Sequence, residues 1–237
     1  MESTIATKMR EERLTSSTVE TSDYNSSTTD IDNTRNLSLL YCVLKRLIDI
    51  VLATLGIIVL IPLFLVIAVC IKLEDGGQVL YLREMVGLRG RRFTLLKFRT
   101  MIPDADTYLE KHPELKLEYQ KNMKLQDDPR VTRSGRFLRK TYLDELPQLF
   151  NVLIGQMTFV GPRAIHQREL ALYGEYAEKR HSVKPGMSGL WQVSPNRHTC
   201  YEERIPLDLK YVNTCSLFLD LVIVLKTLKA LIVQTGV

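Results

Sequence analysis

The chain has 237 residues, enough for one domain with a substantial core, or for one domain with appendages. Its formal net charge is +5 and its pI is about 9.0, which favours an anionic partner such as nucleic acid, lipid headgroups or a phosphorylated substrate. A single tryptophan and the lack of interleaved basic and aromatic residues argue against a nucleic-acid groove. Four cysteines without a CxxC pair or metal-ligand spacing are typical of a reduced, cytosol-facing protein.

The first 38 residues are rich in Ser, Thr, Asp and Asn and contain almost no apolar clusters. Such a segment cannot bury enough surface to offset the conformational entropy that it would lose on folding. We therefore expect a disordered tail over residues 1–38. A membrane helix over residues 39–72 and a cytoplasmic domain over residues 73–237 are predicted to follow it.

Residues 50–71 are uncharged and overwhelmingly aliphatic. As a helix they would extend roughly 33 Å, about the thickness of the hydrocarbon layer of a bilayer. Pro62 lies near the middle and would break or kink the helix, because proline has no main-chain N–H to donate. Basic residues flank the segment on both sides, whereas a spanning helix has them mainly on one side. This pattern favours a re-entrant helix that breaks at Pro62 and leaves on the face where it entered; a kinked single span is the alternative.

The remainder of the chain mixes strand and helix patterns and predicts an α+β fold. Two strands are expected on either side of a glycine-containing turn, and three helices are expected after them. The predicted strands are Gln78–Tyr81 and Arg92–Phe98, and the predicted helices are residues 104–125, a helix that begins at Pro147 and closes at Gly155, and residues 201–213.

The last segment, residues 217–233, is apolar apart from Asp220, Lys226 and Lys229. Two placements fit this pattern equally well. One is a helix buried in the core, and the other is an amphipathic helix lying in the membrane interface, which a basic polar stripe favours.

Two adjacent carboxylates, Asp144 and Glu145, follow the basic stretch Arg130–Lys140. One interpretation is structural: Thr141 with an acidic residue three positions later resembles a capping box for the next helix. The other is chemical, because nearby cations would hold both carboxylates ionised. An ionised Asp144 can attack phosphorus, and Glu145 can hold a divalent metal that bridges phosphates.

Two further motifs place cations where a phosphate could bind. Lys97 and Arg99, in KFRTM, have the same strand parity and would project from one face of a strand. The Gly161-Pro-Arg163 turn presents a guanidinium, which suits bidentate phosphate binding. Taken singly, a solvated basic strand and an ordinary surface loop are equally good explanations of these motifs.

Several stretches occur in a characteristic order: KFRTM, DPRVTRSGRFLRKTYLDELPQLFNVLIGQMTFVGPR, VKPGMSGLWQVS and the apolar C-terminal segment. Together they resemble the bacterial sugar transferase family, the monotopic polyprenyl-phosphate phosphoglycosyl transferases, over about residues 45–231. The resemblance implies transfer of a sugar 1-phosphate from a UDP-sugar to undecaprenyl phosphate, giving undecaprenyl-diphosphate-sugar and UMP. This would be the first membrane step in assembling an exopolysaccharide or another surface glycan.

The resemblance also implies roles for single residues. Asp144 corresponds to the nucleophile, which forms a phosphosugar-aspartyl intermediate, and Glu145 to a residue that helps bind Mg²⁺. Arg139 and Arg163 match positions that contact phosphate or nucleotide. The membrane helix of the family is re-entrant and broken at a proline, here Pro62.

Three other expectations follow from the resemblance. The domain over residues 73–237 would be catalytic, with interfacial helices, on the cytoplasmic face of the inner membrane. A homodimer is compatible with it. Family members commonly have Ser before the breaking proline, and Ile61 in that place weakens the break and adds some support to the alternative of a single span.

Two rival functions remain at the level of sequence. A non-enzymatic protein could use its anchor and basic patches to recruit partners to the membrane surface, and it would not need Asp144 and Glu145. Alternatively, an enzyme with the same substrates could transfer the sugar phosphate directly in a ternary complex, with both carboxylates binding metal. The sequence does not specify which sugar is transferred or which glycan is built.

Overall fold

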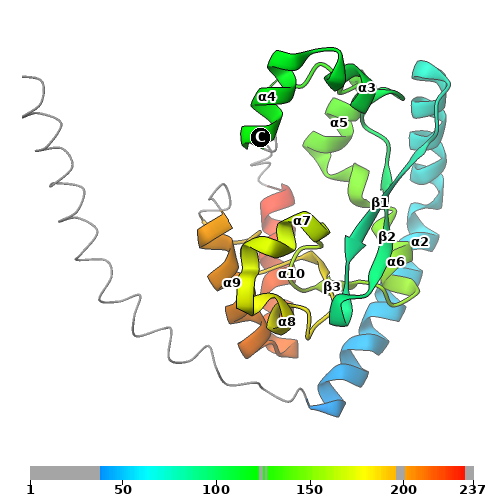
Figure 1. The fold of residues 1–237 in the computed structure, drawn as a ribbon. Coiled ribbons are helices and arrows are strands. Elements are labelled where there is room, and N and C mark those ends of the chain that lie inside the picture. The colour runs from blue at the N-terminus through cyan, green and yellow to red at the C-terminus, as the bar shows by residue number, and fades with distance from the viewer. Residues whose placement is uncertain (1–37, 123–124, 126, 196–200, 233–237) are drawn as a thin grey trace, which may run out of the picture. The chain divides into compact units, whose positions relative to one another are not determined.

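A long helix, α2 (Leu39–Asp75), runs along one edge of the structure and contributes to all three of its hydrophobic clusters (Figure 1). The computed structural model describes residues 38–122, 125, 127–195 and 201–232. The predicted disordered tail lies outside these residues, apart from Ser38.

Two small sheets accompany the helices, so the predicted mixture of helix and strand is confirmed. The strands β1 (Leu80–Val86) and β2 (Arg92–Phe98) form an antiparallel hairpin, while β3 (Thr158–Val160) and β4 (Gly186–Ser188) pair in parallel. The second predicted strand has its predicted bounds, and the first begins at Leu80, two residues after the predicted start at Gln78.

The predicted helix over residues 104–125 is two helices, because Pro113 begins a new one. The helices that begin near Pro147, at Tyr201 and at Leu217 occur as predicted. In chain order the helices after α2 are η1 (Leu88–Gly90), α3 (Ala105–Glu110), α4 (Pro113–Asn122), α5 (Arg133–Thr141), η2 (Leu143–Glu145), α6 (Gln148–Leu153), α7 (Gln167–Leu170), η3 (Ala171–Tyr176), α8 (Ala177–Arg180), α9 (Tyr201–Thr214) and α10 (Leu217–Ile232).

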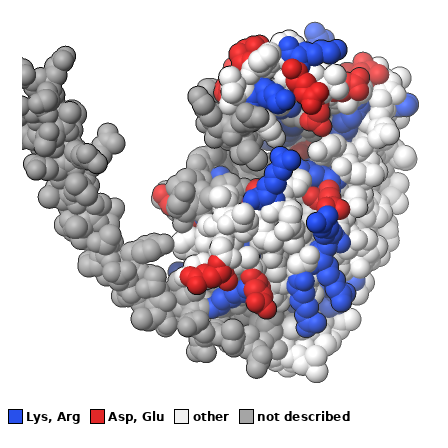
Figure 2. All heavy atoms as spheres, viewed as in Figure 1, with Lys and Arg blue, Asp and Glu red and all other residues white. Residues whose placement is uncertain are grey.

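Most of α2 exposes aliphatic side chains; Val59, for example, is 73% exposed. The edge that α2 forms in Figure 1 is white in Figure 2, so charged residues gather elsewhere on this face. Within the described residues α2 is the one helix long and apolar enough to cross a membrane, with a mean hydropathy of 3.1 over its most apolar stretch. Soluble proteins rarely expose an apolar surface of this extent. The helix is therefore compatible with membrane anchoring.

The helical backbone of α2 continues through Pro62. In Figure 1 the lower, blue part of the helix runs obliquely to its upper, cyan part, and proline is a usual cause of such bends because it removes a main-chain hydrogen bond. A bend is not a break, so the predicted interruption and the re-entrant path are not confirmed by the fold. The helix also extends beyond the predicted end at Lys72, to Asp75, and Gly76 follows with a φ of 72°.

Charged residues near the start of α2 bind distant parts of the chain. Arg46 donates to the carbonyl oxygens of Val152 and Leu153 at 2.7 and 2.8 Å. These are the last carbonyls of α6, and that of Val152 also accepts the N–H of Gly155 at 3.0 Å. Lys45 forms an ion pair of 2.6 Å with Asp220 on α10. The first turns of α2 are thereby attached to two helices of the soluble part.

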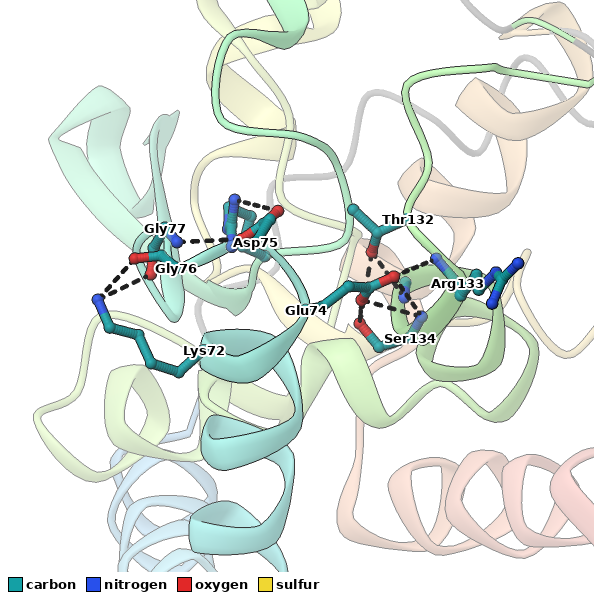
Figure 3. A network of polar contacts seen from close by, with 10 residues as sticks. Lys72, Glu74, Asp75, Gly76, Gly77, Thr132, Arg133 and Ser134 are labelled. Carbon is teal, nitrogen blue, oxygen red and sulfur yellow. Dashed lines mark hydrogen bonds and ion pairs between the residues drawn. The ribbon is translucent and has the colours of Figure 1, made fainter.

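The other end of α2 is attached to the segment after β2 and to α5 (Figure 3). Glu74 accepts hydrogen bonds from the main-chain N–H groups of Arg133 and Ser134, at 2.7 and 3.2 Å. Asp75 binds the guanidinium of Arg99 through two hydrogen bonds. A carboxylate is stabilising at a helix N-terminus because the first N–H groups there lack partners. The end of α2 is therefore attached both to the first turn of α5 and to the residue that follows β2.

The C-terminal helix α10 confirms the core placement for one of its faces, and the interfacial placement stays a prediction. Ile223 is fully buried in a cluster with Tyr211 and Val160. Phe218 and Leu225, by contrast, are 76% and 57% exposed. One face of α10 therefore belongs to the core, and its outward apolar face is compatible with a membrane interface.

Candidate active site

Asp144 and Glu145 lie in η2, the short 3₁₀ turn between α5 and α6. The helix α5 ends at Thr141, and Tyr142 follows with a φ of 57°. This left-handed conformation is rare for a bulky side chain and costs free energy, and such residues cluster at functional sites. Here it reverses the chain directly before the two carboxylates.

The structural interpretation of this motif is wrong, because Thr141 does not begin a capping box. Its hydroxyl donates to the carbonyl oxygen of Phe137 at 2.8 Å, one turn earlier in α5. The residue before α6 is Pro147, and no side chain caps that helix. The two carboxylates are therefore not explained as helix caps.

Lys97, on β2, contacts both carboxylates. Its Nζ lies 2.6 Å from Oε1 of Glu145 and 3.7 Å from Oδ2 of Asp144. Arg163, in the loop after β3, approaches the same Oε1 of Glu145 at 3.1 Å. Asp144 is only 9% exposed, whereas the side chain of Arg163 is 42% exposed. Four residues from three separate segments thus form one cluster, which we call the ion cluster, and one of its cations is open to a ligand.

The two carboxyl groups differ in pKa. Burial alone would raise the pKa of Glu145, but Arg163 and Lys97 outweigh it and lower that pKa to about 2. Burial raises the pKa of Asp144 above its ordinary value, against the opposing charge of Lys97. Glu145 is therefore held ionised, as predicted from the surrounding cations, while Asp144 carries the more basic carboxylate of the pair.

The remaining predicted cations lie in different surroundings. Arg139 donates from Nε to the hydroxyl of Thr100 at 2.9 Å, and its charge lowers the pKa of Asp144. Arg99 is 8% exposed and pairs with Asp75 instead. Lys97 and Arg99 therefore pair with different carboxylates, although the hairpin hydrogen bonding continues at Arg99, whose N–H donates to the carbonyl of Val79 at 2.9 Å. A phosphate-binding role for Arg99 stays a prediction.

The turn that presents Arg163 packs against the glycine-rich stretch around β4. The N–H of Gly161 donates to the carbonyl of Ser188, and the N–H of Gly186 donates to the carbonyl of Pro162, both at 2.9 Å. A Cβ on Gly161 would lie 2.5 Å from the carbonyl oxygen of Lys184. Glycine is required for this close approach of two backbones, which fixes the direction of the loop.

A small cavity lined in part by Arg163 measures about 90 Å³. Trp191 and Arg204 line it, with the guanidinium 4.6 Å from the centre of the ring. Pockets for small-molecule ligands usually measure roughly 300–1,000 Å³. This cavity therefore has room for only part of such a ligand.

The described residues contain no group of three or more His, Cys, Asp or Glu side chains that could hold a metal ion. Mg²⁺ in phosphate sites is commonly bound by one or two carboxylates, with substrate phosphates and water completing its coordination. Both cations that pair with Glu145 contact the same oxygen, Oε1. The adjacent carboxylates therefore fit a metal that binds together with phosphates better than one enclosed by protein ligands.

One residue that the sequence interpretation missed is Asn151, on α6, which is 1% exposed. Its side-chain amide bonds to the main chain of β2 at Thr94 and Leu96, beside Lys97. The signal in the sequence is a lone amide within the apolar stretch of α6. Buried amides need hydrogen-bond partners, so such a residue indicates a tertiary contact.

Comparison with known proteins identifies the family. Residues 40–234 match the family described as bacterial sugar transferase. The exopolysaccharide production protein ExoY of Sinorhizobium fredii is 43% identical over 196 residues, covering 81% of this chain and 87% of that protein. The undecaprenyl-phosphate galactose phosphotransferase of Salmonella typhimurium is 41% identical, covering 81% of this chain and 41% of that protein. The UDP-glucose:undecaprenyl-phosphate glucose-1-phosphate transferase of Klebsiella pneumoniae is 39% identical, covering 78% of this chain and 39% of that protein. On the strength of these matches, the chain belongs to the bacterial sugar transferase family.

Proposed function

We propose that the protein is a phosphoglycosyl transferase that moves a sugar 1-phosphate from a UDP-sugar to undecaprenyl phosphate. The products are undecaprenyl-diphosphate-sugar and UMP, and the product lipid serves exopolysaccharide or other surface glycan assembly. The observation that carries this proposal is the ion cluster, in which two carboxylates and two cations meet beside an apolar helix. The names of the Salmonella and Klebsiella relatives support the lipid acceptor, and the ExoY name supports the polysaccharide.

The first step uses the carboxylate of Asp144 as nucleophile. One of its oxygens attacks the phosphorus that bears the sugar and forms a new P–O bond. The bond from that phosphorus to the UMP oxygen breaks, and its electron pair leaves with UMP. The raised pKa of Asp144 supports this role, because a more basic carboxylate is a stronger nucleophile once ionised.

The second step returns Asp144 to its starting state. A phosphate oxygen of undecaprenyl phosphate attacks the same phosphorus, and the bond to Asp144 breaks with its electron pair returning to the carboxylate. Each step exchanges one P–O bond for another, so no oxidant, water or further reactant is needed. Lys97, Arg139 and Arg163 offset the negative charge that develops on the phosphoryl oxygens.

We further propose that Glu145, with Asp144 beside it, holds a Mg²⁺ ion that enters with the donor phosphates. When bound there, Mg²⁺ would supply positive charge that offsets the charge developing on the leaving group. The low pKa of Glu145 supports this assignment, because a ligand carboxylate has to be ionised. Its pairing with Lys97 and Arg163 keeps the carboxylate at the edge of the site where phosphates would arrive.

A monotopic placement at the cytoplasmic face of the inner membrane fits the contacts of α2. Arg46 near its start and Asp75 at its end both bind the same soluble part of the chain. A helix that crossed the bilayer would carry its ends to opposite sides. We propose that α2 bends at Pro62, keeps both ends on one face despite Ile61, and lies with the outward face of α10 in the membrane surface.

Different observations argue against the two alternative functions, a recruitment protein and an enzyme that transfers the sugar phosphate directly. Membership of a transferase family argues against a recruitment protein without catalytic activity. Direct transfer in a ternary complex would use both carboxylates as equivalent metal ligands, whereas the pKa of one is raised and that of the other lowered. This inequality favours separate roles, a nucleophile and a metal ligand.

Replacing Asp144 with Asn should lower UMP release from a UDP-sugar and undecaprenyl phosphate by more than about a thousandfold, because the amide is not a nucleophile. The assay uses purified protein in detergent with Mg²⁺. Glu84→Gln, which changes an exposed carboxylate of the hairpin, is the control and should keep wild-type activity. A D144N variant with more than a tenth of wild-type activity would remove Asp144 from the mechanism.

Replacing Lys97 with Gln should move the acidic limb of the kcat/KM profile for the donor to higher pH. Activity requires ionised Asp144 and is lost as pH falls through its pKa, which the charge of Lys97 lowers. Without Lys97 that pKa rises, although Arg139, Arg163 and Glu145 still act on the group. The limb should not move in Arg92→Gln, which removes a surface cation. An unmoved limb in K97Q would mean that Lys97 does not tune Asp144.

Labelling of single cysteines at the two ends of α2 tests the membrane path. Leu40→Cys and Leu73→Cys replace side chains that are 66% and 81% exposed, in a background without the native cysteines. With a membrane-impermeant maleimide and sealed vesicles of either orientation, both should react only from the cytoplasmic side. Reaction of one from each side would establish a span.

A further inference from the structure

The outer edge of β2 is bound by a side chain in place of a strand. The hairpin sheet contains β1 and β2 only, so among the described residues β2 has no second strand beside it. Successive residues of a strand direct their main-chain N–H and C=O groups to opposite edges of the strand. Thr94 and Leu96 therefore face the same edge, and an open edge leaves such groups without partners.

The side-chain amide of Asn151 occupies this position. Its Oδ1 accepts the N–H of Leu96 at 3.0 Å, and its Nδ2 donates to the carbonyl of Thr94 at 2.7 Å. These are the bonds that a residue of a neighbouring strand would make. The same Nδ2 also donates to Oε1 of Gln156 at 2.7 Å, which fixes the plane of the amide.

These hydrogen bonds join β2 to α6, and both β2 and the segment of η2 and α6 also contribute residues to the ion cluster. Lys97 directly follows Leu96 on β2, and Asn151 follows Glu145 along the continuous segment of η2 and α6. Besides the apolar packing of Phe93 and Leu95 with Val152, two kinds of polar contact join the segments: the ion pairs of Lys97 and the hydrogen bonds of the amide with β2. A single ion pair leaves a flexible lysine several positions to occupy, whereas a second attachment fixes the main chain from which the lysine extends.

We propose that Asn151 is a positioning residue for the transfer reaction: its amide fixes the outer edge of β2 against α6 and thereby holds Lys97 between Asp144 and Glu145. The inference rests on the proposed function, since it assigns Asn151 to the same site. A purely structural role would stabilise the fold without affecting the charge at Asp144. The two roles therefore predict different results in variants that lose similar stability.

The test compares Asn151→Ala, Lys97→Gln and the double variant N151A/K97Q with Ile223→Ala as the control. Ile223 is fully buried in the cluster of α9 and α10, so its truncation lowers stability without touching β2. For each protein we would measure the Tm, the kcat/KM for the donor by UMP release, and the acidic limb of its pH profile. Wild-type protein that releases no UMP would refute the proposed function itself, before any variant is compared.

N151A should lower kcat/KM by about tenfold to a hundredfold, because a misplacement of about 1 Å is enough for such a loss. Its acidic limb should move to higher pH, in the direction of K97Q, and the double variant should be no worse than K97Q alone within a factor of about two. I223A should lose Tm with an unmoved limb. Losses that multiply in the double variant, or an unmoved limb in N151A, would overturn the inference while leaving the proposed function intact.

Amide hydrogen exchange of Leu96 in the wild-type protein gives a second test that does not depend on how well N151A folds. An N–H at an open strand edge exchanges quickly unless an acceptor is fixed beside it. Strong protection of Leu96, comparable to the paired residues of the hairpin, is expected. Rapid exchange at Leu96 would show that Asn151 does not hold the strand.

Discussion

The packing of the carboxylate-bearing turn onto α2 is the contact on which the rest of the structure depends. Leu143 and Leu146, on either side of Asp144 and Glu145, pack in the cluster that contains Ile67 and Ile71 of α2. The outward face of that helix is apolar and compatible with membrane anchoring, whereas the ion cluster is charged and suits the phosphates of the proposed soluble donor. Because one packed unit contains both, the proposed membrane placement of α2 would hold Asp144 at the boundary between lipid and water. A lipid phosphate and a soluble nucleotide sugar can meet at such a boundary.

Electrostatics then gives adjacent carboxylates different properties. Lys97 and Arg163 both contact Glu145 closely, whereas Asp144 is more buried and farther from either cation. One carboxylate is therefore stabilised as an anion, and the other retains basicity. Pairs of titratable groups whose pKa values are pushed apart commonly divide the work of a reaction. This difference supports the proposed division, with Asp144 as nucleophile and Glu145, which pairs with the exposed guanidinium of Arg163, as metal ligand.

Sequence patterns predicted those features that depend on composition and local periodicity. The apolar stretch of α2, the strand β2 and the helices α9 and α10 are examples. For the carboxylates, the sequence predicted that cations lie nearby but not that Lys97 and Arg163 both contact Glu145. Features set by tertiary contacts or by single dihedral angles were not predictable in this way. The left-handed conformation of Tyr142 and the pairing of Arg99 with Asp75, 24 positions earlier in the sequence, are examples. The amide of Asn151 meets Leu96 across 55 positions of sequence, a separation that no local pattern reports.

The central claim is that Asp144 carries the sugar phosphate between the two substrates. It is tested most directly by incubating the purified protein with a UDP-sugar and Mg²⁺ but no undecaprenyl phosphate, followed by acid quenching, proteolysis and mass spectrometry. The account predicts that one peptide gains the mass of a sugar phosphate group, located at Asp144, and loses it when undecaprenyl phosphate is added before quenching. An unmodified peptide from protein that is active with both substrates, or a group located at another residue, would contradict it.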